Sequence, residues 1–167
     1  MANFTRAGFT KYDGYMTPAS AWRDIKAFIP MDKIIYEPFY GDGTSGKILR
    51  DMGCKKVIHQ DVDFFTVDAH KNMECIISNM PFSIKKQVFT RLKQLNKPFI
   101  MIVPISTICT QYMINLFKGE LQLIIPKKRI QFLKLVDGVI VKSKGSCNFD
   151  CAYVCWQMGF EHDMNWV

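Results

Sequence analysis

The stretch that decides the fold is Glu37-Pro38-Phe39-Tyr40-Gly41-Asp42-Gly43-Thr44, in which two glycines follow an acidic residue. The apolar run at 33–37 predicts a short strand that leads into this stretch, and residues 44–52 predict a helix that ends at Gly53. Glycines at such a turn let backbone N–H groups approach a ligand closely, and the N-terminus of the helix points to the same place. Gly41 and Gly43 would also suit a plain turn. The stretch therefore predicts a strand–turn–helix unit with a candidate ligand site at its turn.

Apolar runs and helical patterns alternate on both sides of this unit. The predicted strands are 56–60, 75–79 and 98–104, and the predicted helices are 83–95 and 106–117. Another helix is expected from Thr17-Pro18, with Thr17 as its N-cap and Pro18 as its first residue. Such alternation is typical of an α/β fold with a parallel sheet covered by helices on both faces.

The character of the sequence changes after residue 120. Strands are predicted at 121–125, 129–133 and 153–158 without helices between them, which indicates antiparallel members of the sheet. Residues 61–74 barely allow a crossover, which needs about a dozen residues, so one strand–helix unit is expected to be abbreviated. The 167 residues fit one domain. We expect an N-terminal arm at 1–16 and a single domain at 17–167.

A second motif, Ser78-Asn79-Met80-Pro81-Phe82, directly follows a predicted buried strand. The side-chain carbonyl of Asn79 and a backbone carbonyl after it could accept the two hydrogens of a planar amine. The amine nitrogen would then develop lone-pair character toward an electrophile. Phe82 could stack on a base flipped out of its helix. The same residues also have a structural interpretation, a turn that ends a strand with Asn in a cap-like role.

Both motifs resemble elements of one enzyme family. Glu37 to Thr44 resembles the Asp-Pro-Phe-x-Gly-x-Gly-Thr loop of amino-methyltransferases, which holds the amino-acid end of S-adenosylmethionine. Asn79 to Phe82 resembles their catalytic Asn-Pro-Pro-Phe motif. Glu37 in place of Asp and Met80 in place of Pro are the departures. The chain is thus similar to class I S-adenosylmethionine-dependent methyltransferases, above all to small adenine-specific (N6) DNA methyltransferases of phages and large DNA viruses.

This resemblance implies a Rossmann-like, seven-stranded, mostly parallel sheet with one antiparallel strand. Tyr15-Met16-Thr17-Pro18 resembles an element that closes over the methionine part of the cofactor, although a helix cap also explains it. Asp61 and Asp63 would bind ribose and the adenine amine in an undecided order, with Phe64 packing on the adenine ring. A solvated acidic turn is the alternative interpretation. The implied cofactor-binding residues are Tyr15, Thr17, Pro18, Glu37, Pro38, Phe39, Gly41, Gly43, Thr44, Asp61, Asp63, Phe64 and Asn79, and the implied catalytic residues are Asn79, Met80, Pro81 and Phe82.

The charge of the chain suits a polyanionic partner. Lys and Arg number 22 against 15 Asp and Glu, a formal net charge of +7. Solvated surface is the usual interpretation of such charges, but one set would flank the substrate mouth of this fold: Lys85, Lys86, Lys127, Lys128 and Arg129. We expect a nucleic acid as the partner, DNA rather than RNA. Because no target-recognition domain is inserted, short loops, a second copy of the chain or a specificity-giving subunit would have to read the target sequence.

The six cysteines and the lack of targeting segments bear on metal binding and on cellular location. Three cysteines lie in or beside apolar runs, as reduced core thiols do. Cys147, Cys151 and Cys155 are spaced four apart without a nearby His, so no metal site is predicted. No signal peptide or membrane span is recognised. The expected location is therefore intracellular: the cytoplasm, or a viral factory or host cell if the source is viral.

The leading hypothesis is N6-methylation of adenine in nucleic acid by an S-adenosylmethionine-dependent N-methyltransferase. Methylation of an RNA base or of a protein glutamine amide remains open, because each reaction needs acceptors for the hydrogens of a planar nitrogen. A different class is a catalytically inactive accessory protein that binds cofactor or nucleic acid, which Met80 and the short middle segment favour.

Overall fold

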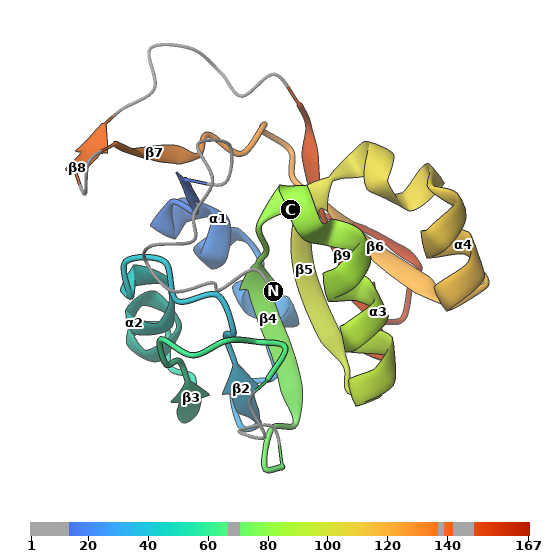
Figure 1. The fold of residues 1–167 in the computed structure, drawn as a ribbon, viewed down its shortest axis with the longest axis horizontal. Helices are drawn as coiled ribbons and strands as arrows, with labels where there is room; N and C mark the ends of the chain where they lie inside the picture. The colour runs from blue at the N-terminus through green and yellow to red at the C-terminus, as the bar shows by residue number, and fades with distance from the viewer. Residues whose placement is uncertain (1–13, 67–70, 137–138, 142–148) are drawn as a thin grey trace.

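The structure is a computed structural model of the chain and describes residues 14–66, 71–136, 139–141 and 149–167 (Figure 1). Its main sheet has seven strands: β2 (Ile34–Tyr36), β3 (Lys56–Ile58), β4 (Cys75–Asn79), β5 (Phe99–Pro104), β6 (Leu121–Ile125), β9 (Cys151–Trp156) and β10 (Met164–Trp166). Their order is β10-β6-β9-β5-β4-β2-β3. The strand β9 runs antiparallel to both neighbours, and the other pairs are parallel. The predicted Rossmann-like α/β fold with one reversed strand is therefore confirmed.

Helices cover both faces of this sheet, as Figure 1 shows. The α-helices are α1 (Ala19–Asp24), α2 (Thr44–Asp51), α3 (Lys85–Leu95) and α4 (Gln111–Phe117), and the 3-10 helices are η2 (Lys26–Phe28), η3 (Phe82–Ile84) and η4 (Ile105–Cys109). Successive strand residues feed two separate cores, because side chains alternate across a sheet. Ile77 packs into the core beneath α1 and α2, and its neighbour Ile76 packs into the core beneath α3 and α4. Both are fully buried, which explains the near-continuous apolar runs of the central strands.

A small second sheet lies beside the main one, at the top of Figure 1. It contains β1 (Tyr15–Met16), β7 (Leu133–Val136) and β8 (Val139–Val141) in the antiparallel order β1-β7-β8. The last two residues of the predicted arm therefore belong to a strand. Residues 1–13 of that arm lie outside the described part of the chain.

One predicted strand is wrong, and one strand of the main sheet was not predicted. The strand expected at 129–133 is not in the main sheet: its alternation arises because Ile130 and Phe132 pack into the core while Arg129 and Gln131 face solvent. The seventh strand of the main sheet is instead β10, which the sequence did not reveal. It forms the sheet edge with Met164 54% and Trp166 62% exposed, so it lacks a buried apolar pattern.

The middle segment is abbreviated in the described residues, as predicted. Between β3 and β4, residues 59–66 and 71–74 contain no helix or strand. Cys54, Cys75, Cys151 and Cys155 are buried free thiols, whereas Cys109 is exposed and Cys147 lies outside the described residues. Within the described ranges, no three His, Cys, Asp or Glu side chains gather as metal ligands would. No helix in those ranges has the length and apolar character needed to cross a membrane.

Candidate functional site

A pocket lies where β2 and β4 end, and it brings the two sequence motifs together. The open space within it, including solvent at its mouth, amounts to about 490 Å³. The residues that line it are Tyr15, Met16, Thr17, Trp22, Glu37, Phe39, Gly41, Ser45, Asn79, Met80, Pro81 and Phe82. Crevices at the carboxyl ends of parallel strands are where ligands bind in open α/β sheets. Met16, Trp22 and Ser45 were not predicted as site residues.

The glycine-rich loop shapes one wall of this pocket. Gly41 and Gly43 have φ angles of +57° and +84°, in the left-handed region that favours glycine. A Cβ on Gly41 would lie 2.8 Å from the Cε of Met16, so β1 approaches the loop as closely as a glycine allows. The turn is closed by the N–H of Gly43, which donates to the carbonyl of Tyr40 at 2.8 Å. Gly43 itself, with Pro38 and Thr44, does not line the pocket.

The Glu37 carboxylate anchors this loop from below. Oε1 accepts hydrogen bonds from the backbone N–H of Phe39 at 3.2 Å and from the Ser78 hydroxyl. Oε2 accepts from the Ser45 hydroxyl at 2.7 Å and from Nδ1 of His59 at 2.6 Å. An ionised carboxylate offers about four lone-pair sites, so protein donors satisfy this one fully. Glu37 is 1% exposed and therefore acts as a positioning residue that ties β2, α2, β3 and β4 together.

His59 is the buried partner of that carboxylate, and no sequence motif predicted a role for it. Its Nδ1 also lies 2.9 Å from the Glu37 carbonyl, and its ring stacks on Tyr40 at 4.8 Å between centroids. Burial lowers the pKa of His59, but hydrogen bonds to Glu37 and its negative charge outweigh this effect, so the pKa is raised above 6.5. A lone His at a strand end carries no sequence pattern that identifies its partner.

Asn79 presents a polar atom to the pocket. Its Nδ2 donates to the backbone carbonyl of Tyr15 at 3.3 Å, and this acceptor requires the NH₂ end of the amide. Oδ1 therefore points the other way. It is buried and has no hydrogen-bond partner among the described residues. A buried carbonyl without a partner is costly, so a ligand that donates a hydrogen bond there would be favoured.

The prediction that Thr17 caps a helix is wrong. Pro18 occupies the N-cap position of α1, with φ −67° and ψ 150°, and α1 has no side-chain cap. The hydroxyl of Thr17 is instead buried at the pocket, with no partner in the described part of the chain. Pro18 does not line the pocket. The helix-cap interpretation of this motif therefore no longer explains Thr17.

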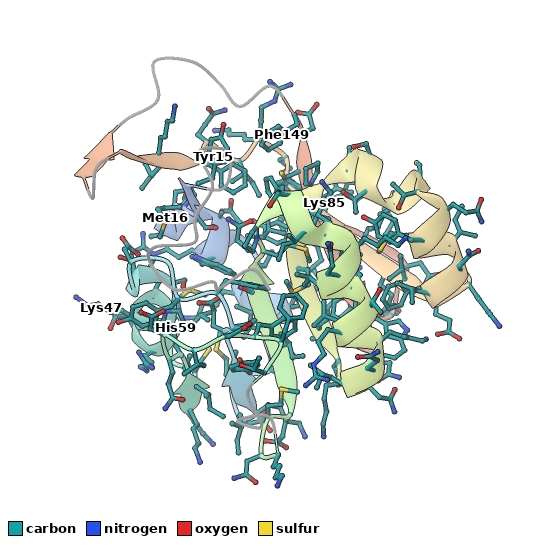
Figure 2. All side chains as sticks on the ribbon, viewed as in Figure 1. Tyr15, Met16, Lys47, His59, Lys85 and Phe149 are labelled. Atoms are coloured by element: carbon teal, nitrogen blue, oxygen red, sulfur yellow. The ribbon has the colours of Figure 1, made fainter. Side chains whose placement is uncertain are left out.

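The three residues after Asn79 differ in environment. Met80 is 2% exposed and packs in the core beneath α3 and α4, which gives a packing reason for Met where the family carries Pro. Phe82 belongs to an aromatic cluster at the mouth, together with Tyr15, Phe132 and Phe149. It meets Phe132 and Phe149 edge to face at 6.1 and 5.4 Å, and Tyr15 contacts the same two rings at 6.1 and 6.0 Å. Figure 2 shows Tyr15 and Phe149 side by side at this end of the sheet.

The acidic segment after β3 lies outside the pocket lining. Phe64 is fully buried against Tyr36 and Phe39, and the packing of its ring on a cofactor adenine stays a prediction. Asp63 accepts the N–H of Phe65 at 2.9 Å through Oδ1, as in an Asx-turn. Asp61 is exposed at the end of the strand. Of the two carboxylates, only that of Asp61 is not engaged in this turn.

The predicted lysines lie near the carboxyl ends of the parallel strands, where the pocket also lies. Lys85 and Lys86 follow β4, and Lys127 and Lys128 follow β6, which runs in the same direction. Lys85 donates to the carbonyl of Phe82 at 2.9 Å and is only partly exposed, whereas the other three lysines are exposed. Arg129 pairs through Nε with Asp150 at 2.6 Å, so part of its charge is already neutralised.

Comparisons with known proteins complete this description. No family model and no curated protein matches the chain. A solved S-adenosylmethionine-dependent O-methyltransferase from Thermotoga maritima is similar, with a TM-score of 0.49 and 8% identity, covering 82% of this chain and 64% of that one. A tRNA (m1A58) methyltransferase from Aquifex aeolicus has a TM-score of 0.45 and 12% identity, covering 89% and 71% of the two chains. The chain thus spans slightly less than two thirds of the first of these proteins.

Proposed function

We propose that this protein is an S-adenosylmethionine-dependent methyltransferase that methylates the N6 amine of adenine in nucleic acid, DNA in preference to RNA. The observation that carries the proposal is the orientation of Asn79. Asn79 lines the pocket, its Nδ2 is held by Tyr15, and its Oδ1 is buried with no partner among the described residues. An acceptor fixed in this way suits a substrate that brings N–H donors, as an exocyclic amine does.

The residues of the pocket fit the cofactor. Gly41 lets β1 approach the loop closely, and the polar atoms of Thr17, Trp22 and Asn79 at the pocket lack partners in the described part of the chain. Such atoms favour a ligand that carries both donors and acceptors. We assign the amino-acid end of S-adenosylmethionine to this pocket and its ribose to Asp61, the exposed carboxylate after β3. The neighbouring Asp63 is engaged in its own turn.

For this reaction the protein mainly has to position the substrate amine next to the methyl donor. Bound S-adenosylmethionine would supply the methyl group to the lone pair of a substrate nitrogen; S-adenosylhomocysteine would leave with the electrons of the broken carbon–sulfur bond, and the nitrogen would release one proton to water. Asn79 Oδ1 accepts a hydrogen bond from the amine, which turns the nitrogen lone pair out of conjugation and toward the methyl group. Asn79 does not itself take the proton. Met80 supplies a backbone carbonyl at the next position, as any residue there would.

Nucleic acid is supported as the substrate by charge and by aromatic surface. Lys86, Lys127 and Lys128 are exposed near the carboxyl ends of the parallel strands, where the pocket lies. The net charge of the chain is +7. Phe82 and Tyr15 line the pocket and are partly exposed, so an unstacked base could meet their rings there.

Methyl transfer from labelled S-adenosylmethionine to DNA, RNA and protein pools tests the proposal. The parent should label nucleic acid, with N6-methyladenine as the product in nucleoside digests. Asn79→Ala should lower the rate by roughly 100-fold or more, in the range seen when a single preorganised hydrogen-bonding group is removed from an active site. Asn115→Ala is the matched control, because Asn115 is exposed on α4 and bonds only to Gln111 among the described residues.

The distribution of label separates the alternatives. Label in glutamine of the protein pool would show that the substrate is a protein and not a nucleic acid. The role of Asn79 would stay the same. Cofactor binding without transfer to any pool would overturn the enzyme and favour an accessory protein. An unchanged rate in Asn79→Ala would remove Asn79 from the mechanism.

A further inference from the structure

The indole of Trp22 has a polar group, unpartnered in the described part of the chain, whose ligand atom the proposed function does not specify. Trp22 is fully buried on α1 and lines the pocket. Its Nε1–H has no hydrogen-bond partner among the described residues. Buried indole N–H groups normally find an acceptor, because a donor left unpaired away from water loses its hydrogen bonds to water without replacement. The pocket is where this acceptor would arrive.

The position of the indole is fixed from the sheet. The hydroxyl of Tyr153, on β9, donates at 2.7 Å to the backbone carbonyl of Ala21, the residue before Trp22. Ala21, Trp22 and Ile25 then pack α1 into the core together with Ile35 and Ile77. The N–H group is therefore held by the fold before any ligand binds.

The partner of this N–H must be an acceptor, since an indole nitrogen cannot accept a hydrogen bond. The Thr17 hydroxyl, also buried at the pocket and without a partner in the described residues, can donate as well. Of the described residues that line the pocket, Glu37 alone is acidic, and its carboxylate is already satisfied by donors from Phe39, Ser45, Ser78 and His59. The free polar groups on the α1 side thus favour an acceptor group, a carboxylate above all, because hydrogen bonds to charged acceptors are the strong ones.

We propose that Trp22 Nε1–H, with the Thr17 hydroxyl beside it in the lining, binds the carboxylate of the amino-acid end of S-adenosylmethionine. This inference rests on the proposed function. The other acceptor atoms of the cofactor are on its ribose and adenine. We assign these groups to the region of Asp61, which is exposed after β3 and does not line the pocket. The pocket between β1, α1 and the loop then holds the end of the cofactor that carries the carboxylate. Selection for a carboxylate thereby comes from two neutral donors rather than from a basic residue.

Three ligands that differ only at this end test the inference by calorimetry. They are S-adenosylhomocysteine, its decarboxylated form S-adenosyl-3-thiopropylamine, and 5′-methylthioadenosine, which lacks the amine as well. Trp22→Phe keeps most of the ring area and removes the N–H. We expect its affinity for S-adenosylhomocysteine to fall roughly tenfold or more, as for a lost hydrogen bond to a charged group. Its affinity for the other two ligands should stay within about twofold of the parent.

Thr17→Val provides a second variant that leaves the core of α1 intact, and it should show the same selective loss. Thermal unfolding of each variant without ligand reports whether the fold is retained. An equal loss of affinity for all three ligands would show that Trp22 only shapes the pocket. An unchanged affinity for S-adenosylhomocysteine would show that the indole N–H makes no hydrogen bond to it. Each result overturns the inference and leaves the proposed function standing. A parent that binds none of the three overturns both.

Discussion

The Nδ1 atom of His59 lies 2.6 Å from Oε2 of Glu37, and the two side chains are only 2% and 1% exposed. His59 comes from the end of β3 and Glu37 from the end of β2, so their contact joins the acidic segment to the glycine-rich loop. Because Nδ1 faces both a carboxylate oxygen and a carbonyl oxygen, it carries a hydrogen in either charge state. The order of the loop, and the space left for a ligand above it, depend on this pair.

Removal of this ring should destabilise the protein. His59→Ala leaves a buried carboxylate without one of its donors, and breaking a buried ion pair in this way costs about 3–5 kcal/mol. Urea denaturation of the parent and the variant measures the difference in the free energy of unfolding. A loss below about 1 kcal/mol, the size of an exposed pair, would show that the contact is weak.

The same pair should make stability depend on pH. The pKa of His59 in the folded protein is raised above 6.5, so its charged form adds stability fully below about pH 6.5. That stability should disappear as the pH rises through the raised folded-state pKa. His59→Asn offers an N–H donor that does not titrate, so its free energy of unfolding should change less from pH 6.5 upward. Parallel pH profiles for the parent and His59→Asn would contradict a charged His59.

Gly46 should not tolerate a methyl group, although alanine normally favours a helix. A Cβ there would lie 2.3 Å from Cδ2 of His59, whose ring is held by Glu37 and stacked on Tyr40. The gain of roughly 1 kcal/mol expected from Gly→Ala in a helix should turn into a net loss of stability. Lys47→Ala is the matched control, since Lys47 is the next residue of α2 and is exposed (Figure 2). Equal thermal stability of Gly46→Ala and Lys47→Ala would exclude this clash.

The glycine loop should be needed for cofactor binding beyond its contribution to folding. Gly43 has φ +84°, and a Cβ would lie 3.0 Å from the Tyr40 hydroxyl, so Gly43→Val should abolish binding of S-adenosylhomocysteine in calorimetry. Gly119→Val shares the backbone strain, at φ +82°, but has open space around it and lies after α4. The control should lose stability and keep ligand affinity. Retained binding in Gly43→Val would displace the cofactor from this loop.

The exposed lysines should set the salt dependence of nucleic-acid binding. Each phosphate contact that is lost reduces the slope of log K against log salt by about 0.9 for duplex DNA and 0.7 for single strands. Replacing Lys86, Lys127 and Lys128 by Ala together should therefore lower the slope by about 2–3, measured by fluorescence anisotropy at several salt concentrations. Lys33, Lys55 and Lys56, which lie at the amino ends of β2 and β3, provide the control set. A similar change in both triple variants would point to net charge rather than to a site.

Local sequence determined the core of the fold and the two motifs. The central strands were predictable because their residues are buried on both faces and therefore read as apolar runs, as Ile76 and Ile77 illustrate. The loop from Glu37 to Thr44 was predictable because Gly41 and Gly43 adopt backbone angles that favour glycine. Asn79 followed from its place at the end of a buried strand.

Only the tertiary structure decided how these pieces meet. The contacts from His59 to Glu37, from Asn79 to Tyr15 and from Tyr153 to Ala21 span 22, 64 and 132 residues, and no local pattern encodes such a distance. The strand β10 was not predicted because an exposed edge strand does not need the alternating apolar pattern by which strands are recognised. Trp22 carries no sequence signal for a site, since its apolar ring and its single N–H belong to the same buried side chain. Whether a buried polar atom is satisfied depends on every neighbour in space, which is why the polar lining of the pocket emerges from the fold and not from the sequence.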